Sequence, residues 1–297
     1  MNTLLETLKY FCQITVELVL LFMAINMVVE LILMYVSKEN IQRYLGRKNI
    51  LGNIIGAAFG ALTPFCACST IPMTVGFLNA GVPFGSTMSF LIASPLLNPI
   101  IIGMLGTMVG VKAMLVYFVI AFAASVLFGI VMEKTGMQKY VKNVRLRKKE
   151  ESAEDRRDWP FKRKIAEAFK AAWGTLRPIM GYLLIGVAIG AIIYGYVPED
   201  FVLRIAGRDS LFAVPVAALL GIPLYIRAET AIPIGVALLG KGMSIGAVVS
   251  LIIGGAGMAI PEMTMLASIF KRRLVAAIVL VIFLTAVIAG YLFNILL

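Results

Sequence analysis

The segment Thr63–Pro72, TPFCACSTIP, contains an irregular part, Thr63–Thr70, that separates two short apolar stretches at about 51–62 and 71–81. Each stretch is shorter than the roughly 20 residues that a membrane-crossing helix needs. Proline, small residues and hydroxyl side chains between them favour an interrupted backbone over one continuous helix. We therefore expect a broken or re-entrant helical hairpin here, with Pro64 and Pro72 at the helix breaks. Pro72 is expected where a half-helix starts, because the missing N–H has no cost in the first helical turn.

The same unit returns 161 residues later without a gap. Gly60 aligns with Gly221, and Ile71-Pro72 aligns with Ile232-Pro233. The second interruption is Pro223–Thr230, PLYIRAET, so Pro223 and Pro233 are expected at the second pair of breaks. A constant offset over about seventy residues indicates an internal duplication.

The composition indicates a membrane protein. The chain has 297 residues, of which 60% are hydrophobic and 14% charged, whereas a typical soluble protein has about 25% charged residues. Apolar runs of about 18 to 25 residues recur along it, and each could cross a bilayer as a helix. We expect an all-α polytopic protein of a prokaryotic inner or plasma membrane, surrounded by the lipid bilayer.

Charge and cysteine usage exclude several other classes. The net charge of +11 comes from basic residues in loops, where membrane proteins carry them for topology, so we expect no nucleic-acid partner. There is no histidine, which excludes imidazole relays and His-based zinc sites, and the three cysteines form no disulfide framework. We expect no metal site and no cofactor.

Residues 134–167 carry dense charges of both signs and divide the chain. They predict a cytoplasmic linker between a transmembrane repeat at 1–133 and a second at 168–297. If each hairpin is re-entrant, each unit crosses the membrane three times, so the second unit starts on the opposite side and the repeats are inverted. If each hairpin forms one broken crossing, each unit crosses the membrane four times and the repeats are parallel. The excess of Lys and Arg in the loop 37–50 and at 271–273 favours the inverted arrangement, since both then face the cytoplasm.

Cys66 and Cys68 are the most specific chemical feature of the first interruption. Two thiols in this spacing can hold one soft ion or metalloid, such as a monosubstituted trivalent arsenical, and they also suit Cu(I) or thiol exchange. The alternative is that they are small packing residues at a helix break. Ser69 and Asn98 are further candidates for substrate binding.

The second unit has Arg227 and Glu229 at the positions of Cys66 and Cys68. Ionisable residues at membrane depth are costly and are therefore functional candidates. Arg227 is expected either to bind an anionic substrate group or to neutralise Glu229. Glu229 and Glu262, which follows a further helix break at Pro261, are candidates for proton coupling, and the alternative for both is a structural ion pair.

Together with Ser94–Pro99, SPLLNP, the TPFCACSTIP segment resembles the predicted permease family that includes the ArsP organoarsenical efflux permeases. The resemblance covers the whole membrane portion. It implies export of trivalent organoarsenicals, because members characterised as arsenical permeases do this and their cysteines are implicated in recognition. On this resemblance Cys66 and Cys68 would contact the metalloid.

The sequence therefore predicts a secondary permease for a small-molecule substrate, one that is not an enzyme. It has no Walker A motif, so ATP hydrolysis would need a separate partner. A homo-oligomer and an association with an accessory subunit are both open. The alternatives are a membrane thiol–disulfide enzyme that uses Cys66 and Cys68, and a non-transporting membrane subunit.

Overall fold

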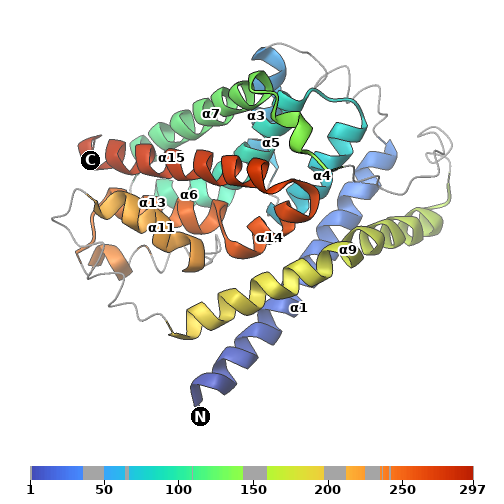
Figure 1. Ribbon diagram of the computed structural model, residues 1–297, viewed down its shortest axis with the longest axis horizontal. Coiled ribbons are helices and arrows are strands. Elements are labelled where there is room, and N and C mark those ends of the chain that lie inside the picture. Colours follow the sequence, from blue (N-terminus) through green and yellow to red (C-terminus); the bar gives the residue numbers. More distant parts are fainter. Residues whose placement is uncertain are drawn as a thin grey trace.

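The computed structural model describes residues 2–35, 50–63, 67–108, 110–142, 159–196, 212–224 and 235–296, apart from Val236 and Lys241. These residues form helices joined by short turns (Figure 1), and no β-strand occurs among them. The expected all-α architecture is confirmed for this part of the chain.

The first unit contains six α-helices and a short 3₁₀ helix within the described ranges. They are α1 (Asn2–Tyr35), α3 (Ile50–Leu62), α4 (Ala67–Asn79), α5 (Phe84–Leu96), α6 (Pro99–Met108), α7 (Val111–Lys134) and η1 (Met137–Tyr140). The helices described in the second unit are α9 (Phe161–Tyr196), α11 (Ala213–Leu224), α13 (Ile245–Gly257), α14 (Ile260–Ile269) and α15 (Arg272–Leu296).

The helix boundaries repeat at the offset seen in the sequence. Both ends of α5 and α13 differ by 161 residues, and so do both ends of α6 and α14 and the starts of α7 and α15. The turn before α5 has Gly81 at φ 79°, and the turn before α13 has Gly242 at φ 94°. Glycine suits both turns because this left-handed backbone costs it little energy.

The helix packing repeats as well. In the first unit α3 packs on α5 and α5 on α7, and in the second α11 packs on α13 and α13 on α15. A Cβ on Gly60 would lie 2.8 Å from the Phe90 carbonyl oxygen, and one on the aligned Gly221 would collide with the carbonyl of Leu251. These glycines let the helix backbones approach closely, as small residues do in membrane helix pairs.

Two pairs of corresponding helices, α7 with α15 and α1 with α9, run in opposite directions. The end of α7 leads into η1, which lies beside the start of α15 (Figure 1). An antiparallel bridge joins Val141 and Phe270 there. The Lys142 amide donates to the Ile269 carbonyl (2.9 Å), and the Lys271 amide donates to the Tyr140 carbonyl (2.8 Å). The long helices α1 and α9 also pack on each other and cross with opposite chain directions.

Several helices are long enough to cross a membrane. Within the described residues three single helices qualify, over Phe11–Val28, Val111–Lys134 and Arg272–Ile295. Two bent pairs could each form a further broken span: α5 with α6, which bend by 49°, and α13 with α14, which bend by 40°. The charged linker predicted at 134–167 ends inside a helix, because α9 already begins at Phe161.

Candidate functional site

The two bent pairs have the same backbone geometry at the break. In the first unit the Leu97 amide donates to the Ala93 carbonyl (2.7 Å), and the chain restarts as a helix with the Ile102 amide on the Asn98 carbonyl (3.0 Å). Asn98 therefore lies in the break itself, where it is half-buried.

In the second unit the Met258 amide donates to the Gly254 carbonyl (3.0 Å), and the Met263 amide donates to the Ala259 carbonyl (3.0 Å). Each of these residues aligns with its counterpart in the first break. The second break therefore lies at Met258-Ala259, just before Pro261.

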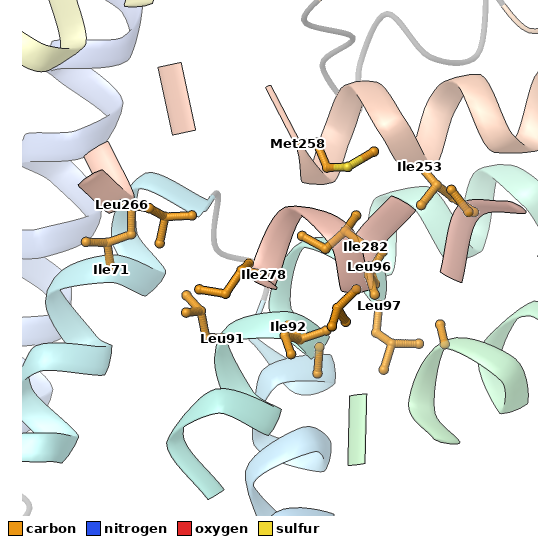
Figure 2. Packing of buried hydrophobic residues seen from close by; sticks show 14 of the residues in the cluster. Ile71, Leu91, Ile92, Leu96, Leu97, Ile253, Met258, Leu266, Ile278 and Ile282 are labelled. Carbon is orange, nitrogen blue, oxygen red and sulfur yellow. The ribbon is translucent and has the colours of Figure 1, made fainter. Parts of the chain in front are cut away.

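The two breaks meet in the interior. Leu96 ends α5 and Gly257 ends α13, and a Cβ on Gly257 would lie 3.8 Å from Cδ2 of Leu96. Figure 2 shows Leu96 beside Ile282 of α15, with Met258 and Ile253 nearby in the same apolar cluster. The two interrupted segments thus adjoin within one hydrophobic core.

The start of α4 is attached to the end of α5. The hydroxyls of Thr70 and Ser94 lie 2.9 Å apart in a hydrogen bond, and both residues are fully buried. Thr74 donates to the Thr70 carbonyl one turn further along α4 (2.7 Å). Cys68 and Ser69 precede Thr70 in the first turn of α4, and Ser94 lies four residues before Asn98. The geometry therefore brings the backbone of Cys68 and Ser69 close to the first break.

A buried tyrosine fixes the first break from a third helix. The Tyr117 hydroxyl in α7 donates to the Leu96 carbonyl (2.6 Å), at the last residue of α5. A carbonyl at a broken helix end has lost its partner in the next turn, and an unsatisfied one is expensive away from water. This role of Tyr117 is not among the predictions from the sequence. The available signal was a tyrosine inside an apolar run, because a buried tyrosine hydroxyl usually needs a partner.

The expectation for Pro72 needs correction. The sequence predicts it at the start of a half-helix, but α4 starts at Ala67 and Pro72 lies inside it. Proline has no N–H, so the Cys68 carbonyl receives no hydrogen bond from position 72. The start is earlier because Ala67–Thr70 already form a helical turn against α5. In the second unit Pro223 lies inside α11, next to its last residue.

Glu262 lies in the first turn of α14, directly after Pro261, and is half-buried. A carboxylate at this position interacts favourably with the partial positive charge of the helix start. α14 packs on α9 and also on α4, where Leu266 lies against Ile71 (Figure 2). α14, which follows the second break, therefore packs against α4, which begins beside the first break.

Several candidate residues lie outside the described part of the chain. They are Pro64, Cys66, Arg227, Glu229 and Pro233. For Cys68 and Ser69 the structure describes the backbone alone. Among the described residues no group of three or more Cys, Asp or Glu side chains could hold a metal ion.

The comparisons with known proteins find permeases and membrane proteins of one family. A family model described as "Predicted permease" (ArsP_1) matches residues 3–295. "UPF0718 protein YcgR" of Bacillus subtilis is 25% identical over 280 residues, covering 92% of each chain. "Putative two-component membrane permease complex subunit" of Streptococcus mutans is 23% identical and covers 92% of this chain and 90% of its own.

"UPF0718 protein MJ0584" of Methanocaldococcus jannaschii is 20% identical and covers 88% of this chain and 87% of its own. No solved structure matches. The apolar helices and these matches together identify a multi-pass protein of the cell membrane. Because the family model matches nearly the whole length of the chain, this chain belongs to the predicted permease family.

Proposed function

We propose that the chain is a secondary permease whose two units are inverted repeats, with the substrate site beside the paired helix breaks. The observation that carries this is the position of Leu96 beside Gly257, together with the opposite directions of α7 and α15. Aligned residues of two units touch each other only close to the axis that relates the units. Inverted repeats with interrupted helices at their interface are a build that secondary transporters use, with the substrate near the midplane.

The substrate that fits this site best is a trivalent organoarsenical or another thiol-reactive small molecule. Cys66 and Cys68 supply two soft ligands for it, and Ser69 and Asn98 supply hydrogen-bonding groups next to the first break. The hydrogen bond between Thr70 and Ser94 supports this assignment, because it holds the first turn of α4 against α5. Arg227 of the second unit would contact an anionic substrate or balance Glu229.

Glu229 and Glu262 are the groups that we propose for proton coupling. Glu262 is half-buried in the first turn of α14. A carboxyl group that passes between an aqueous and a buried environment gains and loses its proton more easily than one that stays in water. Export of the substrate would then be driven by the proton gradient and would involve no covalent chemistry.

The test is flux of phenylarsine oxide, a trivalent organoarsenical, into proteoliposomes that hold the purified chain. Cys66→Ser and Glu229→Gln should each abolish most of the flux. Cys12→Ser is the matched control, because Cys12 is an exposed thiol on α1 far from the breaks in sequence, and it should leave flux unchanged. Equal flux in all three variants would remove the site. A trapped mixed disulfide at Cys66 or Cys68 would favour the thiol–disulfide enzyme instead.

A second candidate function is that of one subunit in a permease complex. The printed name of the Streptococcus mutans relative favours it. If the chain needs a partner, the purified protein will show no flux for any probe, whereas native membranes that contain it will.

A further inference from the structure

A cluster of exposed basic residues lies where the end of the first unit meets the last helix of the second. Its members come from the end of α7, from η1 and the residues after it, and from the start of α15: Lys134, Lys139, Lys142, Lys271, Arg272 and Arg273. We call these residues the η1–α15 cluster. The segments 134–142 and 267–273 contain no Asp or Glu. The cluster therefore gathers positive charge at one end of the α7–α15 pair (Figure 1).

Hydrogen bonds between the two segments hold the cluster in a defined arrangement. The Lys142 ammonium donates to the Ala267 carbonyl near the end of α14 (2.6 Å), and the Lys271 ammonium donates to the Lys139 carbonyl (3.4 Å). The acceptors are neutral, so these bonds orient the cations without cancelling their charge. Together with the antiparallel backbone bridge between the same segments, they set the spacing of the charges before any ligand binds.

The side chain of Tyr140 orients two cations of the cluster. The Arg273 guanidinium donates to the Tyr140 hydroxyl (3.1 Å), and its Cζ lies 5.7 Å from the ring centroid. Nζ of Lys139 lies 5.3 Å from the same centroid. A phenol ring attracts cations through its negative face but carries no full charge to offset them. These contacts therefore leave both positive charges uncompensated.

The cluster has no counter-charge among the residues that the structure describes. None of its six members forms an ion pair there. Residues 143–158, which follow Lys142 and lie outside the described part, include six basic and five acidic residues, so that segment as a whole does not offset the cluster. Like charges that are held close together repel each other, and an anion from outside the chain would relieve this repulsion.

The position of the cluster indicates which anion it meets. Lys134 is the last residue of the candidate membrane span over α7, and Arg272 is the first residue of the span over α15. The cations thus directly follow apolar helices, at the level of the lipid headgroups. Exposed apolar side chains, such as Val131 and Leu280, continue along both helices. The sequence predicts the cytoplasmic side for 271–273, and basic clusters at the cytoplasmic ends of membrane helices attract anionic lipids.

We propose that the η1–α15 cluster binds the headgroup phosphate of an anionic phospholipid, and that the bound headgroup bridges the two units. Cations from both sides of the backbone bridge are available to it, such as Lys139 from the first unit and Lys271 from the second. Binding of the lipid would stabilise the contact between η1 and α15. The inference does not depend on which solute the chain transports.

Thermal unfolding of the full chain in an uncharged detergent tests the proposal. The probe is short-chain phosphatidylglycerol, compared with phosphatidylcholine of the same chain length and with inorganic phosphate at equal concentration. We expect phosphatidylglycerol alone to raise Tm in a saturable way, because a ligand that binds only the folded state stabilises it as its concentration rises. An equal rise with phosphatidylcholine would assign the effect to the acyl chains, and an equal rise with phosphate would assign it to a free anion. Either result, or no rise with phosphatidylglycerol, overturns the proposal.

Paired substitutions test the cluster itself. Lys139→Gln with Lys271→Gln removes one charge from each unit and should weaken the affinity for phosphatidylglycerol roughly 25-fold, since each cation near an anionic lipid contributes a factor of about five. Lys139→Arg with Lys271→Arg keeps both charges and should bind as wild type does. Lys9→Gln with Lys112→Gln is the matched control, because both are exposed lysines outside the cluster and Lys112 lies at the opposite end of α7. Equal losses in the glutamine pair and the control would show a general charge effect and refute the site.

Amide hydrogen exchange locates the bound lipid. With phosphatidylglycerol about ten times above its dissociation constant, exchange at 137–142 and at 271–275 should both slow by about tenfold, because opening then requires release of the lipid. The Lys142 and Lys271 amides are the most direct reporters, since they make the hydrogen bonds of the bridge. Protection of one segment alone would refute the bridging role, and protection confined to other segments would refute the site.

Discussion

Leu96 and Gly257 are aligned residues of the two units, and they lie side by side where α5 and α13 end: a Cβ on Gly257 would be 3.8 Å from Cδ2 of Leu96. The pair is unequal in size, a leucine against a glycine. The side chains of Ile282 and Leu96 fill the space where a side chain at position 257 would lie. The junction of the units therefore depends on one position having no side chain.

Gly257→Ala should destabilise the protein by about 1–3 kcal/mol, the usual cost of overpacking a filled core. The new Cβ would lie 2.8 Å from Cγ2 of Ile282, which is itself buried and attached close to its own backbone. Thermal unfolding in detergent measures the effect. Gly103→Ala is the control, because a Cβ there meets nothing within 4 Å. Equal melting temperatures for both variants would contradict the close packing.

A disulfide between positions 141 and 270 should form readily. Val141 and Phe270 face each other in an antiparallel bridge whose flanking amides make the hydrogen bonds, so their Cα atoms are about 4.5 Å apart. That separation is within the range of disulfides. The experiment uses Val141→Cys with Phe270→Cys in a chain whose native cysteines are serine, and reads the mobility shift after mild oxidation.

The matched control pairs Val141→Cys with Ile295→Cys at the far end of α15, about 35 Å away along the helix. A cross-link in the control but not in the first pair would show that α7 and α15 run in the same direction. That outcome would also remove the support for inverted repeats.

Tyr140 should ionise at lower pH than an ordinary tyrosine. The Arg273 guanidinium donates a hydrogen bond to its hydroxyl (3.1 Å), and this lowers the pKa of Tyr140 from the usual 10.0, with Lys139 adding to the effect. Because the pKa of Tyr140 is lower in the folded state, ionisation stabilises the fold as pH rises through that pKa. The stabilisation is complete above pH 10 and is lost as pH falls through the lowered pKa.

The measurement is the phenolate absorbance of the wild-type protein minus that of Tyr140→Phe. Arg273→Gln should move this difference titration back toward pH 10, since it removes the largest cause of the shift. A titration that is the same with and without Arg273 would mean that the hydrogen bond does not form in solution.

The sequence predicts the repeated architecture well because the two units share residues that decide backbone geometry. Gly81 and Gly242 both take positive φ, and Gly60 and Gly221 both lie where a backbone carbonyl leaves no room for a side chain. Such positions accept only glycine, so the two units have the same residue there and the repeat is visible in the sequence. The break at Pro261 is predicted from a local signal as well, because proline disrupts a helix.

The side-chain hydrogen bonds between helices are much harder to predict. Thr70 and Ser94 are 24 positions apart and Tyr117 and Leu96 are 21 apart, so no local pattern joins them. The correction at Pro72 has the same origin: packing of α4 on α5 stabilises a helical turn ahead of the proline, whereas the local rule puts the proline first. Tertiary contacts decide these features, and one sequence contains little information about them.

A side chain from the last helix of each unit lies at the start of the long broken span. Oδ1 of Asn294 accepts from the Gly246 amide (2.8 Å) in the first turn of α13, and the aligned Glu133 has its carboxylate beside Gly85 in the first turn of α5. The first amides of a helix have no partner within it, so an acceptor from α15 satisfies one of them.

Asn294→Ala should therefore lower stability by about 1 kcal/mol, because the Gly246 amide is buried and loses its acceptor. Asn294→Asp keeps an acceptor oxygen and adds a negative charge at a helix start, as Glu133 does in the first unit, so it should be at least as stable as wild type. Thermal unfolding in detergent compares the three proteins. If Asn294→Asp falls as far as Asn294→Ala, the bond to Gly246 is not what stabilises this end, and the contact of Asn294 is packing alone.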